Sequence, residues 1–184
     1  MSKKFSSLIS CMKQACVTFE PGLSTKERSE AERVFGFMFP EALRAFLGEG
    51  VPVSVGFYDW RDLSVENRVR IKGALRKPFI EIKEEINRLD WPSAWGTEPM
   101  SQVERRTIAL RRLQRAPALI PLYAHRYMPA GVAADPPVFS IAGLDVICYG
   151  KDLCDYLERE FGQSLPPEFE VDALMSVPFW GDLL

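Results

Sequence analysis

The first hydrophobic pattern along the chain has the period of a helix. Residues 5–19 place their apolar side chains within one arc of a helical wheel, with Cys11 and Cys16 on or near the apolar edge. The sequence Glu-Pro-Gly at residues 20–22 follows directly and is typical of a turn. This pattern predicts an amphipathic helix over residues 5–19.

Two further helices are predicted from their end signals. Ser24 and Glu27 have the spacing of a capping box, so a helix should follow Ser24 and end at Gly36, a residue suited to a left-handed cap. Pro40 has the properties of a first-turn residue and should begin the next helix. Residues 51–60 are expected to form an irregular connection.

The segment after Ser64 supports two interpretations. A helix capped by Ser64 is expected, and apolar residues spaced by three or four positions continue a helical stripe from Ile71 to Leu89. Pro78 interrupts that stripe, where it would remove a backbone hydrogen bond and cost about 3 kcal/mol. The alternation over residues 79–83 also fits a short strand, so periodicity favours a helix and Pro78 favours a break.

The remaining elements are one helix followed by segments with strand patterns. Ser101 should cap a helix that extends to about Gln114. Residues 119–127 read as a strand, and residues 137–141 and 144–149 read as a hairpin.

The chain after Gly150 predicts one more helix and a docked tail. Leu153, Leu157 and Phe161 are spaced by four in this last helix, which Gly162 should end. The proline-rich tail carries an aromatic pair at residues 179–180 that should pack back onto the body of the protein. Without an internal repeat or a low-complexity linker, one domain is the simplest organisation.

Composition and charge narrow the function classes. With 184 residues, of which 47% are hydrophobic, the chain can bury one sizeable core. The 23 basic residues nearly balance 25 acidic ones, whereas a general nucleic-acid binder usually has a basic surface. No apolar window of about 18 residues is present, so no membrane span is expected.

The cysteines and the single histidine indicate neither a metal site nor a disulfide framework. The four cysteines form no C-x-x-C pair, and four in 184 residues are sparse for a secreted disulfide scaffold. Residues 8–11 superficially resemble a lipoprotein cleavage box, but the apolar stretch is shorter than the roughly 7–15 residues of a working signal. We therefore expect a cytoplasmic protein with reduced thiols and with no metal or cofactor.

A catalytic constellation is hard to assemble from these residues. His125 is the only possible histidine base, and no G-x-S-x-G nucleophile elbow occurs. Carboxylates such as Glu81 and Glu84, or Asp152 and Asp155, are equally well explained as surface charge or helix-end residues. No catalytic residue is assigned, and a small-ligand binder or enzyme centred on His125 remains an alternative.

Aromatic and arginine residues are the better candidates, because Trp and Arg are enriched among the residues that dominate protein interfaces. The alternatives are that the tryptophans fill the core and that the arginines form a solvated helix face, rather than one that attracts an acidic partner. The candidate partner-binding residues are Asp59, Trp60, Arg61, Asp62, Trp91, Trp95, Arg105, Arg111, Arg112, Arg115, His125 and Arg126.

An ordered series of segments resembles bacterial members of the SUKH superfamily, which is named partly after a yeast regulator of cell-wall synthesis. The segments are residues 59–61 (DWR), 91–96 (WPSAWG), 116–129 (APALIPLYAHRYMP), 137–140 (PVFS), 145–150 (DVICYG) and 152–157 (DLCDYL). The resemblance covers roughly residues 30–162, and leaves residues 1–29 as an N-terminal helical extension and residues 163–184 as a docked tail.

The resemblance implies both a fold and a function. The fold is α+β, with a curved, mostly antiparallel sheet and helices packed around it, and with residues 79–84 as a strand rather than a helix. Bacterial members are mostly associated with immunity proteins that bind and neutralise toxins, whereas eukaryotic relatives resemble regulatory interaction domains. The expected activity is therefore protein binding without catalysis, with a toxin or effector as partner and a regulatory or scaffolding role as the alternative.

Overall fold

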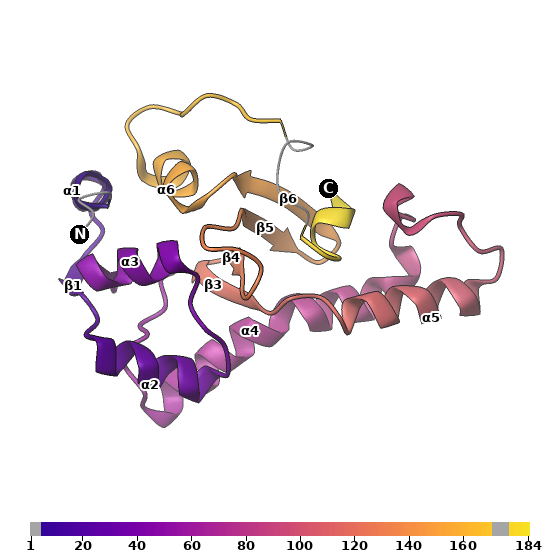
Figure 1. Cartoon of the computed structure of the whole chain (residues 1–184), viewed down its shortest axis with the longest axis horizontal. Coiled ribbons are helices and arrows are strands. Elements are labelled where there is room, and N and C mark those ends of the chain that lie inside the picture. Colours follow the sequence, from indigo (N-terminus) through magenta and orange to yellow (C-terminus); the bar gives the residue numbers. More distant parts are fainter. Residues whose placement is uncertain (1–4, 171–176) are drawn as a thin grey trace.

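A four-stranded antiparallel sheet occupies the centre of the molecule (Figure 1), which is described by a computed structural model over residues 5–170 and 177–184. Its strands follow the order β3-β4-β5-β6, so each strand pairs with its neighbour in sequence. The strands are β3 (Leu119–Tyr123), β4 (Arg126–Pro129), β5 (Val138–Ala142) and β6 (Asp145–Gly150). A separate two-stranded antiparallel sheet joins β1 (Phe19–Pro21) to β2 (Gly50–Pro52).

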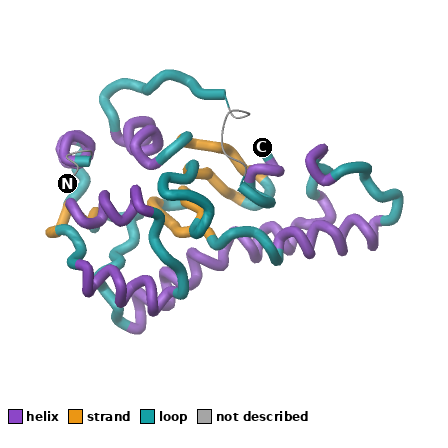
Figure 2. The backbone as a smooth tube through the Cα atoms, viewed as in Figure 1, coloured by secondary structure: helices purple, strands orange, loops and turns teal. Residues whose placement is uncertain are grey.

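Helices lie on both sides of the central sheet, with α6 above it and α4 below it in the view of Figure 1. Figure 2 shows the strands of this sheet at the centre of the molecule, with helices around them. The helices are α1 (Ser6–Gln14), α2 (Thr25–Phe35), α3 (Glu41–Glu49), α4 (Val65–Glu85), α5 (Gln102–Leu113) and α6 (Leu153–Phe161), with short 3-10 turns η1 (Ile86–Arg88), η2 (Ser93–Trp95) and η4 (Gly181–Leu183). The fold class is α+β, as expected, while the curvature of the sheet and the boundaries at residues 29 and 162 stay predictions.

Both faces of the central sheet carry buried side chains, and each face belongs to a different hydrophobic cluster. Along β3, Ile120 belongs to the first cluster and Leu119 to the second, because successive side chains of a strand point to opposite faces. The same alternation separates Tyr127 from Met128 in β4. The first cluster also contains side chains of α1, α3 and α6, and the second contains side chains of α4, α5 and residues 177–180.

The expected end signals of α2 and α3 are confirmed. Ser24 and Glu27 form a reciprocal capping box, and Gly36 ends α2 with a φ of 79°. Pro40 is the residue from which α3 begins. The turn between the two helices is held by Glu32, whose buried carboxylate accepts a hydrogen bond from the backbone N–H of Phe39 at 2.9 Å.

The first helix is shorter than predicted, since it ends at Gln14 rather than at residue 19. Cys16 adopts a φ of 65°, and the N–H groups of Cys16 and Val17 donate to the carbonyls of Lys13 and Met12, which is the Schellman pattern. Glycine usually fills this left-handed position, and because a cysteine stands here instead, no residue signal marks the helix end. Residues 19–21 instead form β1, and part of the segment predicted to be irregular forms its partner β2.

The strand favoured for residues 79–84 is wrong, because α4 continues through Pro78 to Glu85. The helix that the apolar stripe predicts therefore forms despite Pro78. Ile71 is fully buried in the first cluster, and Ile82 is fully buried in the second. The hydrophobic burial along this stripe offsets the lost backbone hydrogen bond, since one buried isoleucine contributes about 1.5–3 kcal/mol.

The strand predicted over residues 119–127 is two strands. Ala124 adopts a φ of 47°, which turns the chain so that β4 pairs back onto β3. The predicted hairpin of β5 and β6 and the helix α6 are confirmed. The aromatic pair of the tail is also docked, with Phe179 2% exposed and Trp180 fully buried in the second cluster.

Candidate functional site

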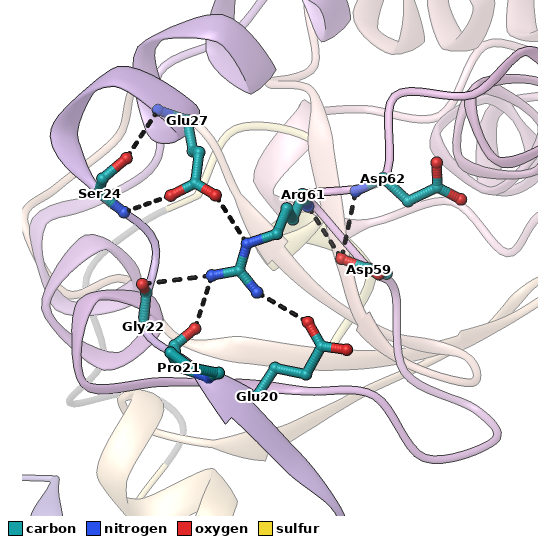
Figure 3. A network of polar contacts seen from close by, with 8 residues as sticks. All are labelled: Glu20, Pro21, Gly22, Ser24, Glu27, Asp59, Arg61 and Asp62. Atoms are coloured by element: carbon teal, nitrogen blue, oxygen red, sulfur yellow. Dashed lines mark hydrogen bonds and ion pairs between the residues drawn. The ribbon is translucent and has the colours of Figure 1, made fainter.

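The predicted binding residue Arg61 lies at the centre of an internal polar network (Figure 3). Its Nε donates to Oε1 of Glu27 at 2.7 Å, and its Nη1 donates to Oε2 of Glu20 at 2.8 Å. Its Nη2 donates to the carbonyl oxygens of Pro21 at 2.6 Å and Gly22 at 3.2 Å. The guanidinium therefore ties the loop after β2 to β1 and to the start of α2.

The neighbours of Arg61 hold the same loop in place. Oδ1 of Asp59 accepts hydrogen bonds from the backbone N–H groups of Arg61 and Asp62, and Asp62 accepts from the backbone N–H of Ser64 at 2.8 Å. Trp60 is only 2% exposed and lies edge-on to three phenylalanine rings of the first cluster. The alternative interpretation of Trp60 as a core residue fits this burial, and the loop has a structural role.

The Arg61 network also shifts the ionisation of Glu27. Hydrogen bonds from Ser24, through its hydroxyl and its backbone N–H, and then from the Arg61 guanidinium, lower the pKa of the Glu27 carboxyl from 4.5 to about 2. The carboxylate is therefore charged throughout the physiological range, as its ion pair with Arg61 requires.

Trp91 and Trp95 meet edge to face, with ring centroids 5.3 Å apart, next to the C-terminal segment. Trp95 is 8% exposed, and its Nε1 donates to Oδ2 of Asp182 at 2.7 Å. Trp91 is half-buried and donates to the carbonyl oxygen of Gly96 at 2.8 Å. Both tryptophans are therefore held by the fold, and only Trp91 keeps an appreciable exposed surface.

The four predicted arginines of the α5 region do not form one uniform face. Arg105 is turned inward, where its Nη2 donates to the carbonyl oxygen of Leu89 at 2.9 Å and its Nε lies 2.9 Å from Oε1 of Glu98. Arg112 packs over the Trp95 ring at 5.0 Å and lies 3.9 Å from Oδ2 of Asp182. These two side chains are committed to intramolecular contacts.

Arg111 and Arg115 differ from the other two. Both are exposed, and within residues 5–170 and 177–184 neither has an ion-pair or hydrogen-bond partner for its guanidinium. Together with Arg112 they line a hollow of about 370 Å³. The other lining residues are Ile108, Pro178, Phe179 and Asp182. The hollow thus combines three guanidinium groups, one carboxylate and an apolar wall.

Sequence reasoning found the arginines of this hollow but missed its other wall. Phe179 was expected to dock, yet nothing in the sequence indicated that it would dock beside α5. Asp182 was not singled out, although its Oδ2 accepts hydrogen bonds from Trp95 Nε1 and, at 3.2 Å, from the backbone N–H of Phe179. An acidic residue shortly after a docked aromatic pair was the only available signal.

His125 lies in the turn between β3 and β4 beside Arg126. Arg126 is a structural residue, because its Nε donates to Glu160 at 3.2 Å, its Nη1 donates to Ser140 at 2.9 Å, and its guanidinium lies 4.1 Å from the centre of the Tyr149 ring. Desolvation, and then the charge of Arg126, lower the pKa of His125 and so favour the neutral imidazole.

This environment gives His125 little of what a general base needs. Among the described residues, its ring nitrogen meets a guanidinium, whereas a catalytic imidazole is usually oriented by an acceptor such as a carboxylate. The Cys148 thiol is also poorly suited to act as a nucleophile. Burial raises its pKa to about 11, which keeps the thiol protonated.

In the described ranges, no group of three His, Cys, Asp or Glu side chains is arranged to hold a metal ion, and no helix has the length and apolarity to cross a membrane. Comparison of the chain with family models, with curated proteins and with solved structures gave no match.

Proposed function

We propose that this chain is a cytoplasmic protein-binding domain without catalytic activity, of the immunity type, which neutralises a toxin or effector by covering its working surface. The observation that carries the proposal is a pair of exposed arginines, Arg111 in the last turn of α5 and Arg115 two residues after the helix ends. Arginine is enriched in the energetically dominant residues of interfaces and presents a planar set of donors to an acidic partner.

The other end of α5 also favours a protein partner. Val103 in its first turn is 77% exposed, and Met100 just before the helix is fully exposed. Methionine and arginine are both enriched in protein interfaces. A net charge of −2 disfavours a polyanion such as nucleic acid, because long-range repulsion opposes the local attraction.

A pull-down from the native host, with the tagged chain as bait and mass spectrometry as readout, tests the proposal. The expected result is a single protein that also binds the purified chain in a one-to-one complex and loses its own activity as the complex forms. A bound protein whose activity is unchanged would instead favour the regulatory or scaffolding role.

The enzymatic alternative has its own test. Turnover of a substrate by the purified chain, abolished in His125→Ala, would overturn the proposal. A fully folded chain that binds no protein in its host would overturn it as well.

A further inference from the structure

We propose that the hollow between α5 and the C-terminal segment is an anchor site for an extended acidic segment of a protein partner, which places two carboxylates on Arg111 and Arg115. This inference rests on the proposed protein-binding function and assigns it a site and a ligand chemistry.

The charge balance of the hollow sets the number of carboxylates. Three guanidinium groups and one carboxylate line it, and the Asp182 carboxylate already lies 3.9 Å from Arg112. Arg112 is further held by its packing over the Trp95 ring. Two cationic groups, Arg111 and Arg115, remain without an intramolecular acceptor in the described ranges, so the hollow is complementary to a ligand with two negative charges.

The placement of the two arginines sets the form of the ligand. Arg111 lies in the last turn of α5 and Arg115 lies in the turn two residues beyond the end of that helix, and both side chains line the same hollow. In an extended peptide, residues two positions apart point to the same side and are separated by about 6.6 Å. Carboxylates at positions i and i+2 of an extended segment therefore both face the hollow, one for each guanidinium group.

The apolar wall distinguishes a peptide from a free anion. Ile108, Pro178 and Phe179 line the hollow beside the charged groups, and they offer no hydrogen-bond donor from their side chains. A volume of about 370 Å³ holds a few side chains and not a whole helix. An apolar side chain following the second carboxylate would cover this wall, whereas an inorganic phosphate would leave it exposed to water.

The position of the arginines has a second explanation that accounts for only part of the arrangement. Cations in the last turn of a helix interact favourably with the helix dipole, by about 0.3–1 kcal/mol. That effect requires no hollow and no apolar wall, and Arg112 alone already supplies a cation in the last turn. The anchor site, unlike the helix dipole, explains why Arg111 and Arg115 line one hollow together with residues of the C-terminal segment.

The test uses a short fluorescent peptide with two aspartates two positions apart followed by a leucine, and the same peptide with asparagines in their place. Binding is followed by fluorescence anisotropy and by the NMR signals of the arginine Nε–H groups and of the Trp95 indole N–H, which is bonded to Asp182. The acidic peptide should bind saturably and shift these signals, and its affinity should fall as the salt concentration rises. The asparagine peptide should bind about tenfold or more weakly, because charge-assisted hydrogen bonds are lost.

Three variants make the test specific to the hollow. The double variant R111E/R115E should lose at least about tenfold in affinity. The matched control K72E/R76E makes the same charge change at an exposed i, i+4 pair on α4 and should retain the affinity within about twofold. Asp182→Asn removes the carboxylate from the lining and should strengthen peptide binding, a direction that general damage to the fold would not produce.

Each other outcome overturns the anchor site. Equal loss in R111E/R115E and K72E/R76E would indicate general charge attraction. Binding of pyrophosphate in the hollow without binding of the acidic peptide would indicate a phosphate site, and concentration-dependent self-association lost in R111E/R115E would identify a second copy as the occupant. A native partner captured equally well by R111E/R115E would leave the proposed function standing while removing this site.

Discussion

The guanidinium of Arg61 donates a hydrogen bond to the carboxylate of Glu27 at 2.7 Å, across 34 residues of sequence. The same guanidinium reaches two backbone carbonyls of the β1–α2 connection. Hydrogen bonds of this kind order backbone segments that have few contacts of their own. We therefore expect the stability of the N-terminal part of the fold to depend on the Arg61 side chain.

Arg61→Ala should lower the free energy of unfolding by about 1–3 kcal/mol, because it removes charge-assisted hydrogen bonds from a side chain that is 26% exposed. Arg61→Lys should restore only part of the loss, since an ammonium group cannot reproduce the planar set of donors. Urea denaturation measures both variants. An unchanged midpoint for Arg61→Ala would show that the network contributes no stability.

The lowered pKa of Glu27 predicts a stability change at acid pH. Because the folded pKa is about 2 and the usual value is 4.5, the contribution of this carboxylate is fully present above about pH 4.5 and is lost as the pH falls toward 2. Wild-type and Glu27→Gln proteins should therefore differ in unfolding free energy at pH 6 and converge near pH 2. A difference that stays constant over this range would contradict the assignment.

Trp180→Ala should destabilise the fold by about 3–5 kcal/mol, as expected for removing a fully buried tryptophan. The loss includes the hydrogen bond that its Nε1 donates to the carbonyl oxygen of Pro117 at 3.0 Å. Trp91→Ala should also destabilise the fold, but less, because Trp91 is half-buried. Equal thermal unfolding temperatures of Trp91→Ala and wild type would show that the packing of Trp91 does not stabilise the core.

Gly73→Ala should stabilise the protein by about 0.5–1 kcal/mol, because Gly73 lies inside α4 and an added Cβ would meet no atom within 4 Å. Gly150→Ala is the opposing control, since its Cβ would lie 2.6 Å from Cβ of Tyr156. Thermal denaturation of both variants checks the pair of expectations. A loss of stability in Gly73→Ala would contradict the open surroundings of Gly73 on α4.

The sequence predicted elements best where local chemistry determines them. Ser24 and Glu27 specify the start of α2 on their own, and the alternation around the β5–β6 hairpin is equally local. At residues 79–84 the helical period was the better guide, and the resemblance to the SUKH superfamily favoured the wrong element. The end of α1 was missed because Cys16 takes a left-handed conformation that no glycine signalled.

The candidate site was only partly predictable for a related reason. Arg111 and Arg115 were identified from residue type and helical spacing, which a single element provides. The separation of these two from Arg105 and Arg112 depends on Leu89, Glu98, Trp95 and Asp182, which lie on other elements. Such assignments require the tertiary arrangement, because a guanidinium has no local preference among distant carboxylates and carbonyls.

The burial of Trp180 has a consequence for protein synthesis. The cover of one face of the central sheet is completed by side chains that leave the ribosome well after the strands themselves, since Trp180 follows the last strand residue, Gly150, by 30 positions. At about 5–20 residues per second, translation leaves that face covered only by α4 and α5 for roughly 1.5–6 s. During this interval the growing chain presents Phe139 and Ile141 to chaperones and to neighbouring polypeptides.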